Sequence, residues 1–111
     1  MITVMSKFPL RPGLTPEQAL EEMTETIPWY RGREGCLRKQ ICLNWDERYG
    51  IGVYTWTDRA RAEAFYAEAT AEIERQTGAA PEIVYFETPV VADNTTGETF
   101  INARLAPGGE Q

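Results

Sequence analysis

Histidine is absent from this 111-residue chain. Its absence excludes Ser-His-Asp and Cys-His nucleophile systems, zinc sites with histidine ligands, and haem held by histidine. The glycine-rich sequences GxGxxG and GxxxxGK[ST] are also missing, so no segment indicates a dinucleotide or nucleoside triphosphate site. We therefore expect neither a cofactor nor a metal. Any chemistry must use lysine, arginine, tyrosine, tryptophan, asparagine, carboxylates or the substrate itself.

Cysteine is scarce, and its two copies, Cys36 and Cys42, fall in one predicted strand. At roughly 3.3 Å per residue they lie about 20 Å apart, whereas a disulfide needs α-carbons within about 7 Å. The two thiols therefore cannot pair within that strand. Small buried hydrophobic residues are the simpler interpretation, with reactive thiols as the alternative.

Basic residues are outnumbered, with 11 Lys and Arg against 17 Asp and Glu and a net charge of −6. This balance argues against nucleic acid or an anionic membrane as a partner, because both need a basic surface. No apolar run approaches the ~18–20 residues of a bilayer span, and the start MITVMSKFPLRPG does not look like a signal peptide. We expect a cytoplasmic protein.

Residues that favour strands dominate the middle of the chain. The segments 35–44 (GCLRKQICLN) and 48–57 (RYGIGVYTWT) predict a hairpin, because residues 44–47 (NWDE) between them have turn chemistry. A further strand is predicted over 81–91 (PEIVYFETPVV), and residues 2–8 (ITVMSKF) alternate well enough for a first strand.

Two helices complete the pattern. The first starts with Thr15 as N-cap and Gln18 in a capping box, and we expect Pro28 to end it. The second runs from Asp58 to Gly78. We expect buried stripes formed by Ala19, Leu20, Met23 and Ile27 in the first helix and by Ala62, Phe65, Tyr66, Ala69 and Ile73 in the second.

The order of elements is β-α-β-β-α-β, which predicts an α+β ferredoxin-like domain with an antiparallel sheet. We assign residues 1–92 to this single domain and 93–111 to a polar C-terminal tail. Within the tail, residues 99–105 are predicted as a short strand or an arm that clasps a partner subunit. Helices on one side leave the other sheet face uncovered, and the chain has no third layer to hide it. We therefore expect a homodimer.

A candidate pocket lies on the second hairpin strand, where Gly50, Gly52, Tyr54 and Trp56 share one face. A hairpin centred on its turn places Lys39 opposite Tyr54, and places Leu37 opposite Trp56. One interpretation is a shallow floor with an aromatic wall, open to a ligand. The other is a core in which the glycines let the second helix approach and the rings fill space.

Other residues have two interpretations each. Arg31, Arg33, Arg38 and Lys39 form a basic cluster that would steer an anionic substrate or would simply be solvated. Trp29 and Tyr30 would form a pocket rim or fasten a loop to the core. Our candidate catalytic residues are Lys39 and Tyr54, and our candidate substrate-binding residues are Trp56, Trp29, Tyr30, Arg38, Phe65 and Tyr85.

The chain resembles the YdhR-like monooxygenases in four runs: GxLRKQ at 35–40, GIGVYTWTD at 50–58, AEAFY at 62–66 and PEIVYFETPVV at 81–91. Those proteins belong to the dimeric α/β-barrel superfamily, alongside the antibiotic biosynthesis monooxygenases. The resemblance implies a ferredoxin-like monomer, two of whose sheets pack face to face into a barrel. Some relatives oxidise aromatic or phenolic compounds with dioxygen and no metal, haem or flavin. Others are cyclases, isomerases or haem-degrading enzymes.

Our leading functional hypothesis is therefore a cofactor-independent monooxygenase acting on a small aromatic or phenolic compound. In this chemistry the deprotonated substrate supplies the electrons, and the protein binds it, stabilises an oxyanion and excludes water. Lys39 would stabilise the oxyanion, Tyr54 would donate a hydrogen bond or relay a proton, and Trp56 would stack on the ring. The alternatives are a polyketide-type cyclase or isomerase, and a non-catalytic small-molecule-binding dimeric module.

Overall fold

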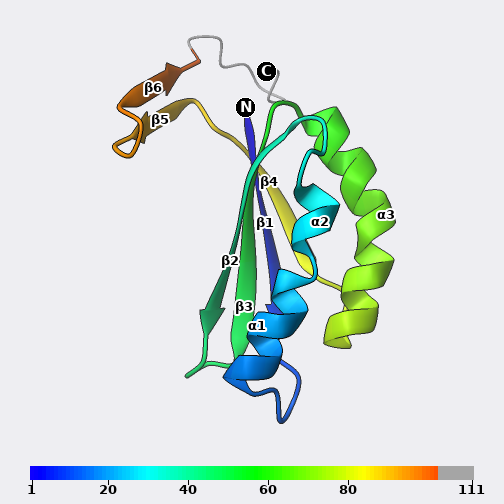
Figure 1. The fold of residues 1–111 in the computed structure, drawn as a ribbon. Helices are drawn as coiled ribbons and strands as arrows, with labels where there is room; N and C mark the ends of the chain where they lie inside the picture. Colours follow the sequence, from blue (N-terminus) through cyan, green and yellow to red (C-terminus); the bar gives the residue numbers. More distant parts are fainter. Residues whose placement is uncertain (103–111) are drawn as a thin grey trace.

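The computed structural model describes residues 1–102. Within these residues, six strands and three helices follow one another: β1 (Ile2–Pro9), α1 (Pro16–Thr24), α2 (Ile27–Tyr30), β2 (Cys36–Asn44), β3 (Tyr49–Trp56), α3 (Arg59–Thr77), β4 (Glu82–Glu87), β5 (Val90–Asp93) and β6 (Glu98–Ile101) (Figure 1). The first four strands form one antiparallel sheet in the order β2-β3-β1-β4. This is the α+β ferredoxin-like arrangement that the sequence predicts.

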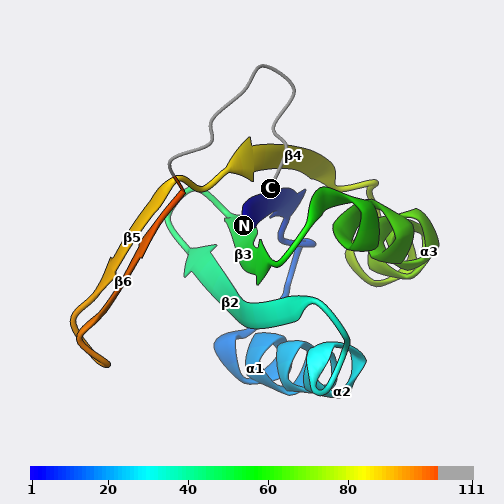
Figure 2. The ribbon, with the colours of Figure 1, turned by 90° about the horizontal axis from the view of Figure 1, so that it is seen from above.

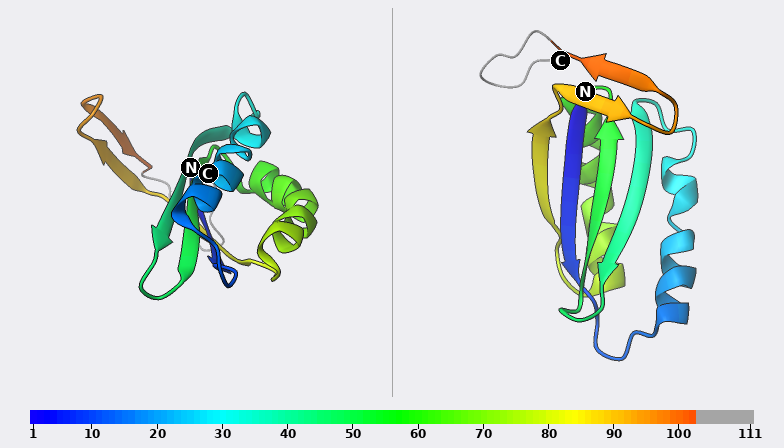
Figure 3. Two further views of the ribbon diagram at one scale, coloured as in Figure 1. Left: turned by 60° about the horizontal axis from the view of Figure 1, so that its bottom comes forward. Right: turned by 90° about the vertical axis from the view of Figure 1, so that its left-hand side faces the viewer.

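All three helices lie on the same side of the sheet, and the opposite face of the sheet is uncovered (Figures 2 and 3). The alternation along β3 reflects this, because every second residue from Gly50 to Trp56 is buried and the residues between them are partly exposed. On the covered side, Trp56 and Tyr66 are the largest fully buried side chains. The core therefore lies between the sheet and α3.

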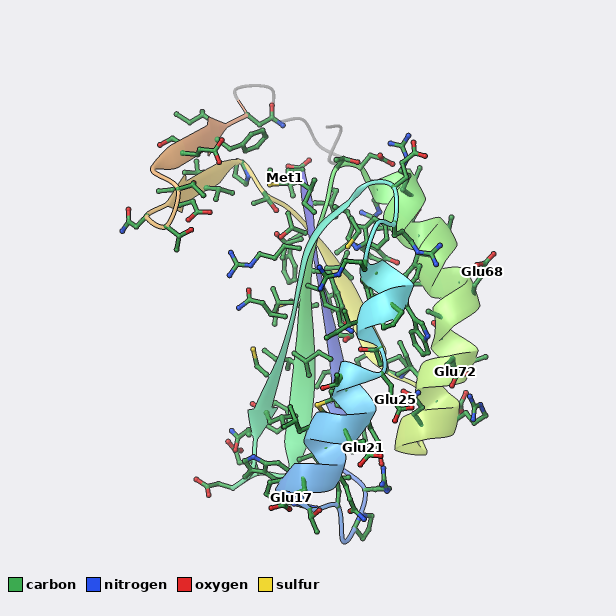
Figure 4. The ribbon with its side chains drawn as sticks, viewed as in Figure 1. Met1, Glu17, Glu21, Glu25, Glu68 and Glu72 are labelled. Carbon is green, nitrogen blue, oxygen red and sulfur yellow. The ribbon has the colours of Figure 1, made fainter. Side chains whose placement is uncertain are left out.

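The two long helical segments begin as the sequence predicts. Thr15 accepts a hydrogen bond from the backbone N–H of Gln18, whose side chain accepts one from the backbone N–H of Thr15. Asp58 caps α3, and Gly78 ends it with a φ of 84°. Glutamates lie on the outer sides of these helices, Glu17 and Glu21 on α1 and Glu68 on α3 (Figure 4).

The first helix differs from the prediction. It ends at Thr24, and Pro28 lies in the first turn of the separate helix α2, where a missing N–H costs nothing. Leu20, predicted to be buried, is 71% exposed, and Ile27 is also exposed. A nine-residue helix covers only a narrow stripe, formed here by the buried Ala19 and the partly buried Met23.

The last predicted strand is two strands. The segment 81–91 breaks at Thr88 and Pro89, because proline has no N–H to continue the ladder. Beyond the break, β5 pairs with β6 in a separate hairpin that projects from the sheet on the side away from the helices (Figures 1 and 2). The predicted strand at 99–105 is thus present as β6 up to Ile101, while residues 103–105 lie outside the described part of the chain.

No helix within residues 1–102 is both long and apolar enough to cross a membrane.

Candidate functional site

A cavity of about 70 Å³ lies between the covered face of the sheet and the helices. Its apolar wall is formed by Phe8, Leu10, Leu14, Met23, Ile41 and Ile73. Its polar side is formed by Ser6, Thr26, Tyr30, Lys39 and Tyr54. A few polar groups gathered at one side of an apolar cavity are typical of a small-molecule site.

Lys39 enters the cavity from the edge strand β2. The hairpin register places it opposite Tyr54, as the sequence predicts. Its Nζ lies 4.2 Å from the centre of the Tyr30 ring and donates a hydrogen bond to the Thr26 hydroxyl. Burial without a counter-charge lowers the pKa of Lys39 to about 8, because the ammonium loses more solvation than its neighbours restore. No carboxylate among the described residues forms an ion pair with it.

Tyr54 is buried beside Lys39 on the central strand β3. Its ring stacks on Tyr30 at 5.2 Å between ring centres and 14° between planes. Its hydroxyl lies 3.4 Å from the Ser6 hydroxyl, which is also buried. Gly52 makes this position possible, because a Cβ at that residue would overlap the Tyr54 ring. The space left by the absent side chain of Gly52 is therefore filled by the Tyr54 ring, and it is not the open pocket floor that one interpretation of the sequence predicts.

The neighbouring tyrosines stay protonated. Burial raises the pKa of Tyr30 well above its ordinary value, and the adjacent Tyr54 and Tyr66 hydroxyls add to the rise. Burial also raises the pKa of Tyr66, which accepts a hydrogen bond of 3.3 Å from Trp56 Nε1. Tyr30 and Tyr66 are therefore neutral hydrogen-bonding groups at pH 7, whereas Lys39, with a pKa of about 8, titrates close to neutral pH.

An ion pair lies in a solvent-exposed part of the cavity wall. The two terminal guanidinium nitrogens of Arg11 donate to the two oxygens of the Glu22 carboxylate, at 2.7 and 2.5 Å. The pair connects the loop after β1 to helix α1, and its hydrogen bonds lower the pKa of Glu22. Both side chains are 38% exposed, so the pair forms the rim and adds no unpaired charge to the cavity.

The structure brings together half of the predicted site. Lys39, Tyr54, Trp29 and Tyr30 all line the cavity. Trp56 is completely buried and packs in the core, where Phe65 also lies.

The two remaining predicted residues lie elsewhere. Arg38 is exposed on β2, and its register partner Thr55 places it on the uncovered face. Tyr85 lies on β4 with the Arg59 guanidinium 4.8 Å above its ring. The predicted hairpin register is correct at Lys39 but fails closer to the start of β2. A bulge between Cys36 and Arg38 places Cys36, and not Leu37, opposite Trp56.

Most of the cavity residues that the sequence analysis did not name could not have been predicted from sequence patterns. Ser6 could have been, because it is the polar residue on the buried face of β1 that also includes Ile2 and Val4. Thr26 lies between two helices and has no pattern of its own. A second hollow lies beside the cavity, with Arg31 and Arg38 in its wall, and Lys39 and Tyr30 line both spaces.

Solved structures share this fold. An antibiotic biosynthesis monooxygenase superposes with a TM-score of 0.62 at 17% identity, over 79% of this chain and 98% of its own. A variant of SnoaB, a cofactor-independent oxygenase from Streptomyces nogalater, superposes with a TM-score of 0.56 at 13% identity, over 96% of each chain. The protein PA3566 from Pseudomonas aeruginosa gives 0.55 at 18% identity, over 95% of this chain and 94% of its own.

No protein-family model matches the chain, and no curated protein matches its sequence. The structural likeness at these identities shows the fold alone, which this chain shares with solved structures of antibiotic biosynthesis monooxygenases. The ferredoxin-like fold of the monomer, which the resemblance implies, is therefore confirmed. The narrower likeness to the YdhR-like proteins stays a prediction.

Proposed function

We propose that this protein is a cofactor-independent monooxygenase that acts on a small aromatic or phenolic compound. The observation that carries the proposal is the position of Lys39, a partly buried amine with no carboxylate partner among residues 1–102, in a cavity with apolar walls. Such a cation stabilises a phenolate strongly, because little water screens the two charges. The shared fold with SnoaB and the antibiotic biosynthesis monooxygenases supports the same reaction class.

The chemistry follows from the groups in the cavity. The substrate hydroxyl would lie against Lys39 and lose its proton, either to the neutral amine or to water, leaving a phenolate beside an ammonium. The electron-rich ring would then react with dioxygen at a ring carbon that carries hydrogen. One oxygen atom stays on that carbon as a carbonyl, and the other leaves as water, whose two hydrogens come from that carbon and from the substrate hydroxyl. The substrate supplies all the electrons and ends as a quinone, so no other reductant is needed. Tyr54 would donate a hydrogen bond to the oxygen that carries charge, and Phe8 and Leu14 would exclude water.

We further propose that the active form is a homodimer joined through the uncovered sheet face. Val84 and Phe86 on that face are 49% and 46% exposed, and Met5, Ile51 and Val53 extend the same apolar surface. The β5–β6 hairpin projects on this side, in a position to reach a partner (Figure 2). A stable interface of this kind buries more than ~1,000 Å² in total. The described part of the tail, residues 93–102, would then contribute the clasping arm.

A binding module is the second candidate function. Among the described residues, Glu22 is the sole carboxylate in the cavity wall, and Arg11 already occupies it. A cavity with no free carboxylate base suits a protein that holds a phenolic ligand without converting it. A cyclase or isomerase would use the same ammonium for an enolate, and it would also lack a carboxylate base.

Dioxygen uptake separates these functions. The protein would be mixed with phenols, naphthols and anthrones in an oxygen-electrode cell, with products followed by mass spectrometry. We expect uptake with at least one compound, and a loss of about a hundredfold in kcat/KM for Lys39→Met. Arg75→Met is the control, since it also removes a cation, its side chain is 71% exposed on helix α3, and it does not line the cavity.

Each other result has a meaning. A rise in melting temperature with a phenol but no uptake would select the binding module. Uptake that Lys39→Met leaves unchanged would overturn the role of Lys39.

A further inference from the structure

The sequence contains two lysines, and the structure gives them one shared feature and one difference. Lys39 Nζ lies 4.2 Å from the centre of the Tyr30 ring, and Lys7 Nζ lies 4.6 Å from the centre of the Tyr49 ring. Lys39 lines the cavity under the helices, whereas Lys7 is exposed. The two amines therefore differ in their access to an apolar cavity while both contact a tyrosine ring.

We propose that Lys39 is a covalent binding site for small aromatic aldehydes, which its amine captures reversibly as an imine. The neutral amine adds to the carbonyl carbon, so that a carbon–nitrogen bond forms and the carbonyl becomes a carbinolamine. Loss of water then breaks the carbon–oxygen bond and leaves a C=N bond. Both hydrogens of that water come from the amine, and no oxidant or reductant takes part. This activity goes beyond the proposed oxygenation and does not depend on it.

The surroundings of Lys39 favour the reactive form of the amine. Only a neutral amine attacks a carbonyl, and burial that lowers its pKa to about 8 raises the neutral fraction at physiological pH. The groups that face it are the Tyr30 ring, the Thr26 hydroxyl and the Cys36 thiol, with no carboxylate within ion-pair distance among the described residues. None of these holds the amine as a paired cation.

The cavity also selects the partner of the amine. Phe8, Leu14, Met23 and Ile41 give an apolar wall that favours an aromatic ring over a short aliphatic chain. Tyr54 lies across the register from Lys39 and offers a hydroxyl in the same cavity for the carbinolamine oxygen. An aromatic aldehyde would place its ring against the wall and its carbonyl at the amine.

Reductive trapping tests the proposal on the intact protein. Benzaldehyde or acetaldehyde is added with sodium cyanoborohydride, and peptide mass spectrometry counts benzyl and ethyl groups on Lys39, on Lys7 and on the N-terminal amine. Acetaldehyde measures the ordinary access of each amine, including any shielding in an oligomer. We expect the benzyl-to-ethyl ratio to be roughly tenfold or more higher at Lys39 than at Lys7, the order expected when a cavity buries a ring.

A cavity-filling variant sharpens the test. Met23→Trp leaves Lys39 in place and occupies the apolar space, so the ratio at Lys39 should fall toward that at Lys7. Equal ratios at the two lysines in the wild-type protein would overturn the proposal, as would benzylation confined to the N-terminal amine. The wild-type ratios decide the matter if Met23→Trp does not fold.

Discussion

The two faces of the sheet differ in what covers them. On the side of the helices, Trp56 is completely buried, and polar side chains that include Lys39 and Tyr54 line one cavity. On the other side, Val84 and Phe86 stay about half exposed within a single chain. The covered face therefore completes its site without a partner, whereas the uncovered face presents an apolar surface. Substitutions on the two faces should accordingly affect different measurements.

The largest effect is expected from Trp56→Ala. The ring is fully buried among Phe65 and Tyr66, so its removal should lower the free energy of unfolding by about 3–5 kcal/mol. Thr55→Ala is the matched control, because it is the neighbouring residue on the opposite face and should cost less than ~1 kcal/mol. Urea denaturation measures both. A similar loss for the two variants would contradict the assignment of the faces.

Substitutions on the uncovered face should change the strength of dimerisation. Changing Val84 and Phe86 together to aspartate places charges in the proposed interface and should weaken dimerisation by ~3 kcal/mol or more, over a hundredfold. Leu20→Asp is the control, because Leu20 is equally apolar and 71% exposed, but lies on helix α1. Sedimentation should give twice the 12.6 kDa chain mass for the wild type and the control, and the monomer mass for the double variant. A wild-type monomer would refute the dimer.

A smaller effect of opposite sign is expected from Lys39→Met. The folded pKa of about 8 lies below the ordinary value of 10.5, so below pH 8 both states bind the proton and burial destabilises the fold. We expect the variant to gain about 1–2 kcal/mol at pH 7, a figure reduced for partial solvent screening. Between pH 8 and 10 the folded wild type loses its proton first and recovers stability. The gain should therefore be smaller at pH 9, and denaturation at the two pH values measures it.

The smallest change in stability is expected from Tyr54→Phe. It removes one hydroxyl whose partner Ser6 lies at 3.4 Å, so the free energy of unfolding should shift by no more than ~1 kcal/mol. Affinity for a phenol should fall several-fold if that hydroxyl faces the ligand. Calorimetric titration of the variant and the wild type tests this, and an unchanged affinity would remove Tyr54 from the site.

The sequence predicts those features that depend on local patterns. The alternation along β3 placed Tyr54 and Trp56 on one shared face, and the turn at 44–47 set Lys39 opposite Tyr54; the structure has both features. The capping box at Thr15 and the glycine at position 78 marked helix ends correctly. Each of these depends on contacts between residues that are near in the chain or related by one turn.

The features that the sequence did not predict depend on packing between different helices and strands, or on local irregularities of the sheet. The bulge between Cys36 and Arg38 moved Leu37 out of its predicted pairing with Trp56, and no residue type in this segment predicts such a bulge. Leu20 fits a helical stripe, but α1 contacts the rest of the protein through Ala19 and Met23. The cavity itself combines Ser6, Thr26 and Ile73, which the fold brings together from β1, a loop and α3. Periodicity within one element cannot show such a meeting.

The central claim is that the cavity at Lys39 holds the ligand, and a crystal structure of the protein soaked with 1-naphthol tests it most directly. We predict density for the naphthol ring against Phe8 and Leu14, with its hydroxyl within hydrogen-bonding distance of Lys39 Nζ. Naphthol bound only outside the cavity, with Lys39 still held by Thr26 and Tyr30 alone, would contradict the account.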